Sequence, residues 1–436
     1  MGNCMAQKSA LSSQEDIEYL QEITVEVAER NSSGKVVRHN KLQFIATRPI
    51  NQKTDIFLQE RPIKVSGCIL PGLNPHGDEK KCQDNYTYAF LNGLIFCGLF
   101  DGHGPVGEQV SAFGTKFCQK YFLQNTHMFE EKPKETLIHM LELCDKELHH
   151  EEIDYELSGS TAVIVLLSNN SIHTASLGDS RAVLGTISDM SFALPAPQNK
   201  YHRHFTVGRV LKPIPLTIDQ KPNHEEEYVR IRSAGGIVEK IADVMGNTIG
   251  PYRVWKPKCD LPGLAMSRSI GDGVGKTIGV ISTPVYHYFT LYAENDQYIV
   301  LASDGVWDVM ENAEVITFIE KFKEKCESSI ISDEYPARTI NSSIARLVCE
   351  EARYRWLGLI EAEDVNIDDI SCIVIDLSRR GISTESTKPE RNVKAFQSLA
   401  LGKNYQEHLE NYIKSKEEQE DFSREKTEED KNEEKN

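Results

Sequence analysis

Runs of apolar residues with the length of a β-strand recur along the chain, and several of them end abruptly in polar residues. Continuous apolar runs bounded by Gly, Asp or Asn are typical of buried strands. We expect such strands at residues 85–90, 94–100, 160–167, 171–178, 297–302 and 370–375. Asn169 and Asn170 separate two of these runs, and the sequence therefore predicts a β-hairpin at that point.

Between the strands, apolar residues recur at every third or fourth position, which is the spacing of a helix with one buried face. This spacing predicts helices at residues 107–124, 134–151, 225–233, 312–327 and 342–357. Residues 186–211 are polar and predict an irregular insertion, in which His202-Arg203-His204 is expected to be solvated rather than metal-bound. Strands and helices thus follow one another in mixed order.

A carboxylate stands beside one end of several predicted strands. The residues are Asp84, Asp101, Asp304 and Asp368, and Asp101 is followed by Gly102 and His103. Each motif taken alone is also compatible with an ordinary Asp-Gly turn. If these ends meet at one pole of a sheet, their charges repel one another unless cations lie between them. Oxygen ligands favour Mg²⁺ or Mn²⁺ over Zn²⁺, and His103 can transfer a proton near neutral pH.

Taken together, these motifs resemble those of the metal-dependent serine/threonine protein phosphatases of the PPM (type 2C) family. The matching stretches are Gln83-Asp84, Phe100-Asp101-Gly102-His103-Gly104, Ser158-Gly159-Ser160-Thr161-Ala162, Gly178-Asp179-Ser180-Arg181, Asp219-Gln220-Lys221-Pro222, Ala234-Gly235-Gly236, residues 264–272, Ser303-Asp304-Gly305-Val306-Trp307-Asp308 and Asp368-Asp369-Ile370-Ser371. They occur in the order of the family and cover residues 65–378. Any one stretch can arise by chance, whereas the ordered set is specific.

The resemblance implies an α+β fold in which two antiparallel β-sheets form a sandwich with α-helices on both outer sides. We expect three regions: an N-terminal extension at residues 1–60, the phosphatase catalytic domain at 61–380, and a C-terminal tail at 381–436. The tail is dense in charge and lacks an apolar stripe, which predicts a disordered or partly helical segment. Residues 241–261 correspond to the flap beside the active site of the family.

The resemblance also implies a reaction, the hydrolysis of phosphoserine and phosphothreonine in proteins with two Mn²⁺ or Mg²⁺ ions and no phosphoenzyme. By this resemblance, Asp101 bridges both ions, and the Gly102 carbonyl group, Asp304 and Asp368 complete the metal ligands. Asp84 is expected to orient the attacking water, and His103 to protonate the leaving alkoxide. Asp219 and Asp308 are the residues expected to hold a weaker third ion.

One position departs from the family pattern in a way that affects phosphate binding. Family members usually place a basic residue a few positions before the residue that corresponds to Asp84, whereas this chain has Glu79 five positions before it, and Lys80 and Lys81 lie nearer. We therefore assign the substrate phosphate to Lys80 or Lys81. Gln83 stands where part of the family has Glu, which makes the site less negative by one charge.

Two other functions remain compatible with the sequence. A pseudophosphatase would bind phosphoproteins or act as a scaffold without turnover, and the Glu79 and Gln83 departures keep this reading open. Retention of Asp101, Asp304 and Asp368 argues against it, because a binding module does not need three carboxylates at strand ends. A hydrolase of small phosphate esters is the second alternative, and the sequence hardly separates it from a protein phosphatase.

Composition limits the classes of binding partner and the cellular compartment that we expect for this protein. The 436-residue chain has a net charge of -17, which disfavours nucleic acid because phosphate backbones are bound by clustered Lys and Arg. Its ten cysteines stand singly, and no apolar run has the length of a membrane span. We expect a cytoplasmic monomer that acts on phosphorylated proteins, with the nucleus as a further compartment.

The N-terminus carries a weak acylation signal. Gly2 can accept myristate after Met1 is removed, and Cys4 can accept palmitate, although Ala6 stands where Ser or Thr is usual. A single acyl chain gives only marginal membrane binding, so a stable association with a membrane surface would require both sites.

Overall fold

The computed structural model describes residues 20–30, 36–46, 56–58, 61–74, 80–168, 170–189, 209–242, 245–292, 294–328, 344–359 and 366–378. Gly2, Cys4, Glu79 and the triplet His202-Arg203-His204 lie outside the described residues. The chain divides into two compact units. The first unit contains Met1–Glu60, Asn85–Ser180 and Leu216–Leu291, and the second contains Arg61–Asp84, Arg181–Pro215 and Tyr292–Asn436.

The main sheet of the first unit has seven strands, in the order β15-β7-β6-β8-β9-β16, with β5 paired to β6. Their bounds are β5 Asp84–Leu91, β6 Leu94–His103, β7 Gly159–Ser160, β8 Ala162–Leu167, β9 Ser171–Leu177, β15 Ile270–Gly271 and β16 Val285–Thr290. β8 and β9 pair antiparallel, with Val165 opposite Thr174, and so form the predicted hairpin. β6 pairs antiparallel with β8 and, at its last residues, with β7.

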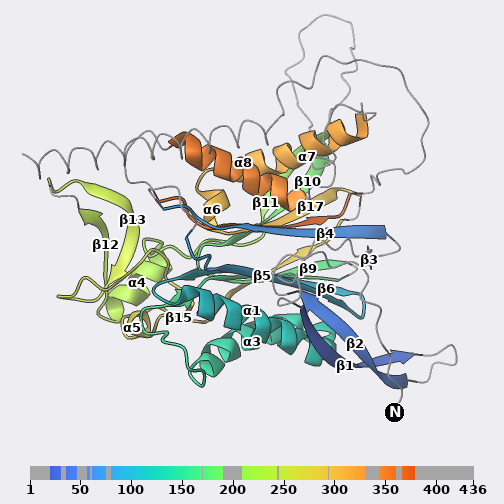
Figure 1. Ribbon diagram of the computed structural model, residues 1–436, viewed down its shortest axis with the longest axis horizontal. Helices are drawn as coiled ribbons and strands as arrows, with labels where there is room; N and C mark the ends of the chain where they lie inside the picture. The colour runs from blue at the N-terminus through green and yellow to red at the C-terminus, as the bar shows by residue number, and fades with distance from the viewer. Residues whose placement is uncertain are drawn as a thin grey trace, which may run out of the picture. The chain divides into compact units, whose positions relative to one another are not determined.

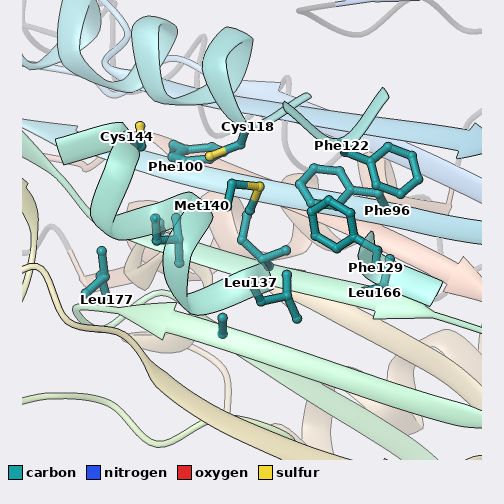
Figure 2. Packing of buried hydrophobic residues seen from close by; sticks show 14 of the residues in the cluster. Phe96, Phe100, Cys118, Phe122, Phe129, Leu137, Met140, Cys144, Leu166 and Leu177 are labelled. Carbon is teal, nitrogen blue, oxygen red and sulfur yellow. The ribbon is translucent and has the colours of Figure 1, made fainter. Parts of the chain in front are cut away.

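Helices α1 (Gly107–Gln124) and α3 (Pro133–Leu148) pack beside this sheet (Figure 1), and α2 (Thr126–Glu131) adds Phe129 to the same core. Figure 2 shows the core between them, where the rings of Phe96, Phe122 and Phe129 lie together. The Phe96 and Phe122 ring centroids are 4.9 Å apart in a stacked arrangement, and Phe129 meets Phe122 edge-on at 5.4 Å. All three side chains are at most 1% exposed. This core anchors β6, the strand that carries Asp101 and His103 at its end.

The remainder of the first unit consists of smaller elements. β1 (Leu20–Arg30) and β2 (Val36–Ala46) form an antiparallel hairpin of their own. A three-stranded sheet follows in the order β12-β13-β14, and α4 lies beside it in Figure 1. The bounds are α4 Glu225–Ser233, β12 Ile237–Ala242, β13 Thr248–Trp255, β14 Pro262–Leu264 and α5 Gly273–Lys276.

A buried ion-pair network joins α4 to the segment before β15. Glu227 is 5% exposed and accepts hydrogen bonds from Arg230 at 2.6 Å, from Arg268 at 2.5 Å and from the Ser267 hydroxyl group at 2.5 Å. Burial raises the pKa of Glu227, but the hydrogen bonds from Arg230, Arg268 and Ser267 outweigh it and lower this pKa to about 2. The ionised carboxylate therefore stabilises the fold.

We expect Glu227→Gln to lower the free energy of unfolding by about 3 kcal/mol at neutral pH, because both arginines lose their buried counter-charge. The folded-state pKa is depressed, so the stabilisation is complete above about pH 4.5 and is lost as the pH falls towards about 2. Urea unfolding of the wild type and the variant from pH 7 to pH 3 measures the difference, with the exposed Glu225→Gln as the control. A loss that stays the same throughout this range would contradict the assignment to the Glu227 charge.

The second unit is built on a six-stranded sheet in the order β11-β10-β17-β18-β4-β3. The bounds are β3 Ile56–Leu58, β4 Arg61–Leu70, β10 Arg181–Asp189, β11 Arg209–Pro215, β17 Asp296–Ala302 and β18 Ile370–Asp376. Helices α6 (Asp304–Trp307), α7 (Asn312–Ser328) and α8 (Ile344–Leu359) lie on one face of this sheet (Figure 1). Central strands β17 and β18 are buried along their whole length, which explains the apolar runs at residues 298–302 and 372–375 within them.

The predicted class is confirmed, because helices and antiparallel sheets make up both units. One local prediction was wrong. The segment 186–211 is not irregular at its ends, since β10 continues to Asp189 and β11 begins at Arg209. There strand pairing outweighs the weak local preference of the residues. Within residues 241–261, the described residues include the end of β12 and the whole of β13, which pair antiparallel.

Candidate active site

The end of β6 presents Asp101, Gly102 and His103 in the first unit. The Asp101 amide donates to the Thr161 hydroxyl group at 3.0 Å, and the Asp101 carbonyl oxygen accepts from the Thr161 amide at 2.8 Å. Gly102 pairs with Ser160 and is buried. These main-chain contacts hold the strand end in place, so the Asp101 side chain and the Gly102 backbone can serve as oxygen ligands.

His103 makes a close contact with a second carboxylate that the sequence did not assign. Its Nε2 atom lies 2.8 Å from Asp272 Oδ2. Asp272 is fully buried and has φ +57°, a left-handed conformation that is uncommon for residues other than Gly. Gly159 leaves the room for this pair, since a Cβ atom there would lie 2.2 Å from Asp272 Oδ2 and 2.7 Å from His103 Nε2.

This environment favours the protonated imidazole. Burial lowers the pKa of His103, but the charge and the hydrogen bond of Asp272, together with the charge of Asp179, outweigh it and raise the pKa above its usual value. Nδ1 of His103 is buried and has no hydrogen-bond partner within the described part of the chain. The Nε2 atom is therefore occupied by Asp272, and Nδ1 is the atom that can donate a proton.

The second unit gathers its candidate carboxylates at one end of β17 and β18. Asp304 begins α6 directly after β17 and Ser303, and Asp368 precedes β18. The Ser303 amide donates to the Ser371 carbonyl oxygen at 3.1 Å, and the Ser371 amide donates to the Ser303 hydroxyl group at 3.0 Å. A Cβ atom on Gly305 would lie 2.0 Å from the Asp369 carbonyl oxygen, so only Gly allows the two strand ends to approach this closely.

Asp84 lies beside this cluster and is 1% exposed. Neither oxygen of its carboxylate has a hydrogen-bond partner within the described residues. Burial raises the pKa of Asp84 to about 7, the charges of Asp369 and Asp368 contribute to the rise, and the nearby hydroxyl groups of Ser371 and Ser303 oppose it. A buried carboxylate without a partner, repelled by its neighbours, is the environment that a hard cation would stabilise.

The lysines predicted to bind phosphate differ in their surroundings. Lys80 Nζ lies 3.7 Å from Asp368 Oδ1, and the Lys80 side chain is partly exposed. Lys81 is exposed. Lys80 is therefore the one that the structure places next to a predicted metal ligand.

The predicted metal ligands are divided between the two units. Asp101 and Gly102 belong to the first unit, and Asp304 and Asp368 to the second. The two residues assigned to a third ion are divided as well, since Asp219 lies in the first unit and Asp308 in the second. Within the described residues, no group of three or more His, Cys, Asp or Glu side chains is arranged to hold a metal ion.

A further acidic residue in the first unit, Asp179, received no role in the sequence analysis. Asp179 is 2% exposed and pairs through Oδ2 with Lys221, while Oδ1 has no hydrogen-bond partner among the described residues. The signal for it was already present in the stretch Gly178-Asp179-Ser180-Arg181. Neighbouring Arg181 donates to Asn312 at 2.8 Å and lies over the Trp307 ring in the second unit.

Each unit thus presents carboxylates at strand ends, and the first unit adds a histidine held by a buried carboxylate. The family model for protein phosphatase 2C matches residues 91–353, and the chain belongs to this family. The expectation drawn from the motifs is thereby confirmed.

Curated relatives agree with this membership. The chain is 35% identical over 260 residues to probable protein phosphatase 2C 34 of Arabidopsis thaliana, covering 56% of this chain and 66% of the relative. It is 31% identical over 294 residues to probable protein phosphatase 2C 72 of the same plant, covering 65% of this chain and 77% of the relative. It is 29% identical over 337 residues to probable protein phosphatase 2C 38 of Oryza sativa subsp. japonica, covering 67% of this chain and 65% of the relative. The chain thus spans about two thirds of the length of several relatives.

Solved structures support the fold. A serine-threonine phosphatase 2C from Toxoplasma gondii aligns with a TM-score of 0.54 and 18% identity, covering 82% of this chain and 99% of that one. A sex determining protein from C. elegans aligns with a TM-score of 0.51 and 21% identity, covering 72% of this chain and 65% of that one. At these identities the likeness concerns the fold alone.

Proposed function

We propose that this protein hydrolyses phosphoserine and phosphothreonine in proteins with the help of two Mn²⁺ or Mg²⁺ ions. Family membership supports the reaction class, and the observation that carries the proposal is the buried, unpartnered Asp84 carboxylate beside Asp368 and Asp369. Such a group is costly in an apolar surrounding and is expected where a cation and a water molecule complete the site.

The proposed ligands are Asp101, the Gly102 carbonyl group, Asp304 and Asp368, with Asp219 and Asp308 for a weaker third ion. When bound, the cations would make an attacking water more acidic and neutralise the charge of the phosphoryl group. The chain supplies the positions of the ligands: β6 carries the first two, and the ends of β17 and β18 carry the others. Asp84 would accept a hydrogen bond from the attacking water and fix its direction.

His103 is the proposed general acid. The Asp272 carboxylate fixes the imidazole through Nε2 and favours its protonated form, which leaves the Nδ1 proton for the alkoxide of serine or threonine. Asp272 would thus orient the histidine without contacting the substrate. Lys80 is the proposed contact for the substrate phosphate, since its ammonium group lies next to Asp368.

The assay that tests the proposal uses a phosphothreonine peptide with Mn²⁺, with and without EDTA. We expect phosphate release with Mn²⁺ and its loss on chelation. Binding of the peptide without release would favour the pseudophosphatase. Release from small phosphate esters with no activity on the peptide would favour a small-ester hydrolase.

Phosphorylated proteins are the proposed partners, and a cytoplasmic monomer is the proposed state. Acylation at Gly2 and Cys4 remains a proposal that rests on the sequence alone, because both residues precede the described part of the chain. None of the described helices is long and apolar enough to cross a membrane.

A further inference from the structure

Asp369 is a buried carboxylate next to the predicted metal ligand Asp368, and it is 6% exposed. Its two oxygens face two different backbone amides. Oδ1 accepts a hydrogen bond from the Gly72 amide at 2.5 Å, and Oδ2 accepts one from the Gln83 amide at 2.7 Å. Both oxygens are therefore occupied by amide groups, which distinguishes Asp369 from the more exposed Asp368.

The two amides lie at opposite ends of one segment. The chain leaves β4 after Leu70, and residues 72–83 connect it to Asp84 at the start of β5. One carboxylate thus joins both ends of this connection. The Lys80 amide also donates to the Gly72 carbonyl oxygen at 2.8 Å. Leu73, beside Gly72, exchanges two backbone hydrogen bonds with Ile367 at 3.1 and 2.9 Å.

Glycine at position 72 is required for this closure. A Cβ atom there would lie 2.4 Å from Lys80 Cε, 2.5 Å from the Ile367 carbonyl oxygen and 2.9 Å from the Asp368 carbonyl carbon. The Gly72 backbone therefore packs directly against the segment that carries Asp368. Two charge-assisted hydrogen bonds offset the cost of burying the Asp369 carboxylate.

The segment carries two residues of the proposed site. Lys80 extends from it to within 3.7 Å of Asp368 Oδ1, and Asp84 follows Gln83 directly. The Asp369 amide in turn donates to Asp368 Oδ1 at 2.8 Å. Asp369 is thus the residue that makes hydrogen bonds both to the connection bearing Lys80 and Asp84 and to the carboxylate of Asp368.

We propose that Asp369 is a positioning residue that holds the backbone at Gly72 and Gln83 and thereby places Lys80 and Asp84 relative to Asp368. This inference rests on the proposed function, because the expected effects of losing the Asp369 hydrogen bonds are weaker Mn²⁺ binding and slower turnover. It assigns to Asp369 no contact with the substrate or with the cations.

The test compares Asp369→Ala and Asp369→Asn with Asp376→Ala in the full-length protein. Asp376 is a matched control, since it is a buried aspartate at the opposite end of β18, 7% exposed and paired with Lys323 at 2.7 Å. We expect Asp369→Ala to weaken Mn²⁺ binding, measured by titration calorimetry, and to lower kcat on a phosphothreonine peptide, each by about 10- to 100-fold. Asp376→Ala should leave the Mn²⁺ affinity and kcat within about twofold of the wild-type values, well short of the 10- to 100-fold losses expected for Asp369→Ala.

Hydrogen exchange supplies a readout that requires neither metal nor substrate. We expect the Gly72 and Gln83 amides to exchange faster in Asp369→Ala, and only one of the two to do so in Asp369→Asn, because the amide side chain keeps one acceptor oxygen. The Mn²⁺ affinity of Asp369→Asn should lie between those of the wild type and Asp369→Ala. If Asp369→Ala does not fold, the comparison of Asp369→Asn with the wild type decides the question.

Unchanged exchange at both amides in the folded Asp369→Asn variant, or unchanged Mn²⁺ affinity alongside faster exchange, would overturn the proposal. A wild-type protein without turnover on the peptide would instead contradict the proposed function. The positioning role of Asp369 would then still be judged by exchange and by Mn²⁺ binding.

Discussion

Replacing Asp101 or Asp304 by Ala is expected to reduce Mn²⁺-dependent release of phosphate from a phosphothreonine peptide by about 10²-fold or more. Rate losses of about this size follow when one preorganised charged or polar group is removed from an active site. Each change removes a carboxylate that would bind a cation. Both side chains are partly buried, and other contacts hold the backbone around them. The Asp101 amide donates to Thr161, and Ser303, next to Asp304, is hydrogen-bonded to Ser371. The fold should therefore persist.

Turnover measured across a Mn²⁺ titration, together with the unfolding transition in urea, tests this expectation. Asp154→Ala serves as a control, because Asp154 is an exposed aspartate of the first unit. Wild-type turnover at limiting Mn²⁺ in either variant would show that the ligand assignment is wrong. A large fall in stability would indicate a structural role instead.

Removal of His103 is expected to have the second largest effect, and that effect should depend on the leaving group. His103→Ala should lower turnover of a phosphothreonine peptide by about 10²–10⁴-fold, because an alkoxide must receive a proton as it leaves. The loss should be much smaller for p-nitrophenyl phosphate, whose aryl oxide is a good leaving group without protonation. The contact between His103 Nε2 and Asp272 motivates this expectation.

Parallel assays of both substrates with the wild type, His103→Ala and His150→Ala give the comparison. His150 is exposed and lies outside the proposed site, so its replacement should change neither rate. Equal losses on the two substrates in His103→Ala would assign His103 a structural role. In that case the buried Asp272 would be explained by packing alone.

Local elements were largely predictable because their signals are local. The helix predicted at 107–124 is α1, and the one predicted at 225–233 is α4. Helix α1 shows apolar residues at helical spacing, and its buried face contains residues that this spacing selects, such as Val110 and Phe122. The prediction for 186–211 was wrong at its start because the end of β10 depends on a partner far away in sequence, β17.

The candidate site divides in the same way. Asp84, Asp101, Asp304 and Asp368 could be selected from sequence because each stands beside a strand end, and their roles stay predictions. Asp272 and Asp369 could not be selected, although both are buried carboxylates in stretches that match the family. Their partners are far away in sequence: Asp272 lies 169 positions from His103, and Asp369 lies 297 positions from Gly72.

By itself, the sequence determined the family, the α+β class and several strands of both main sheets, because periodicity and ordered motifs are properties of neighbouring residues. Only the tertiary structure decided which carboxylate orients His103, which one closes the connection before Asp84, and how strongly Asp84 resists ionisation. These properties depend on burial and on charges brought together by folding, and no local pattern encodes the dielectric environment or the neighbours of a side chain.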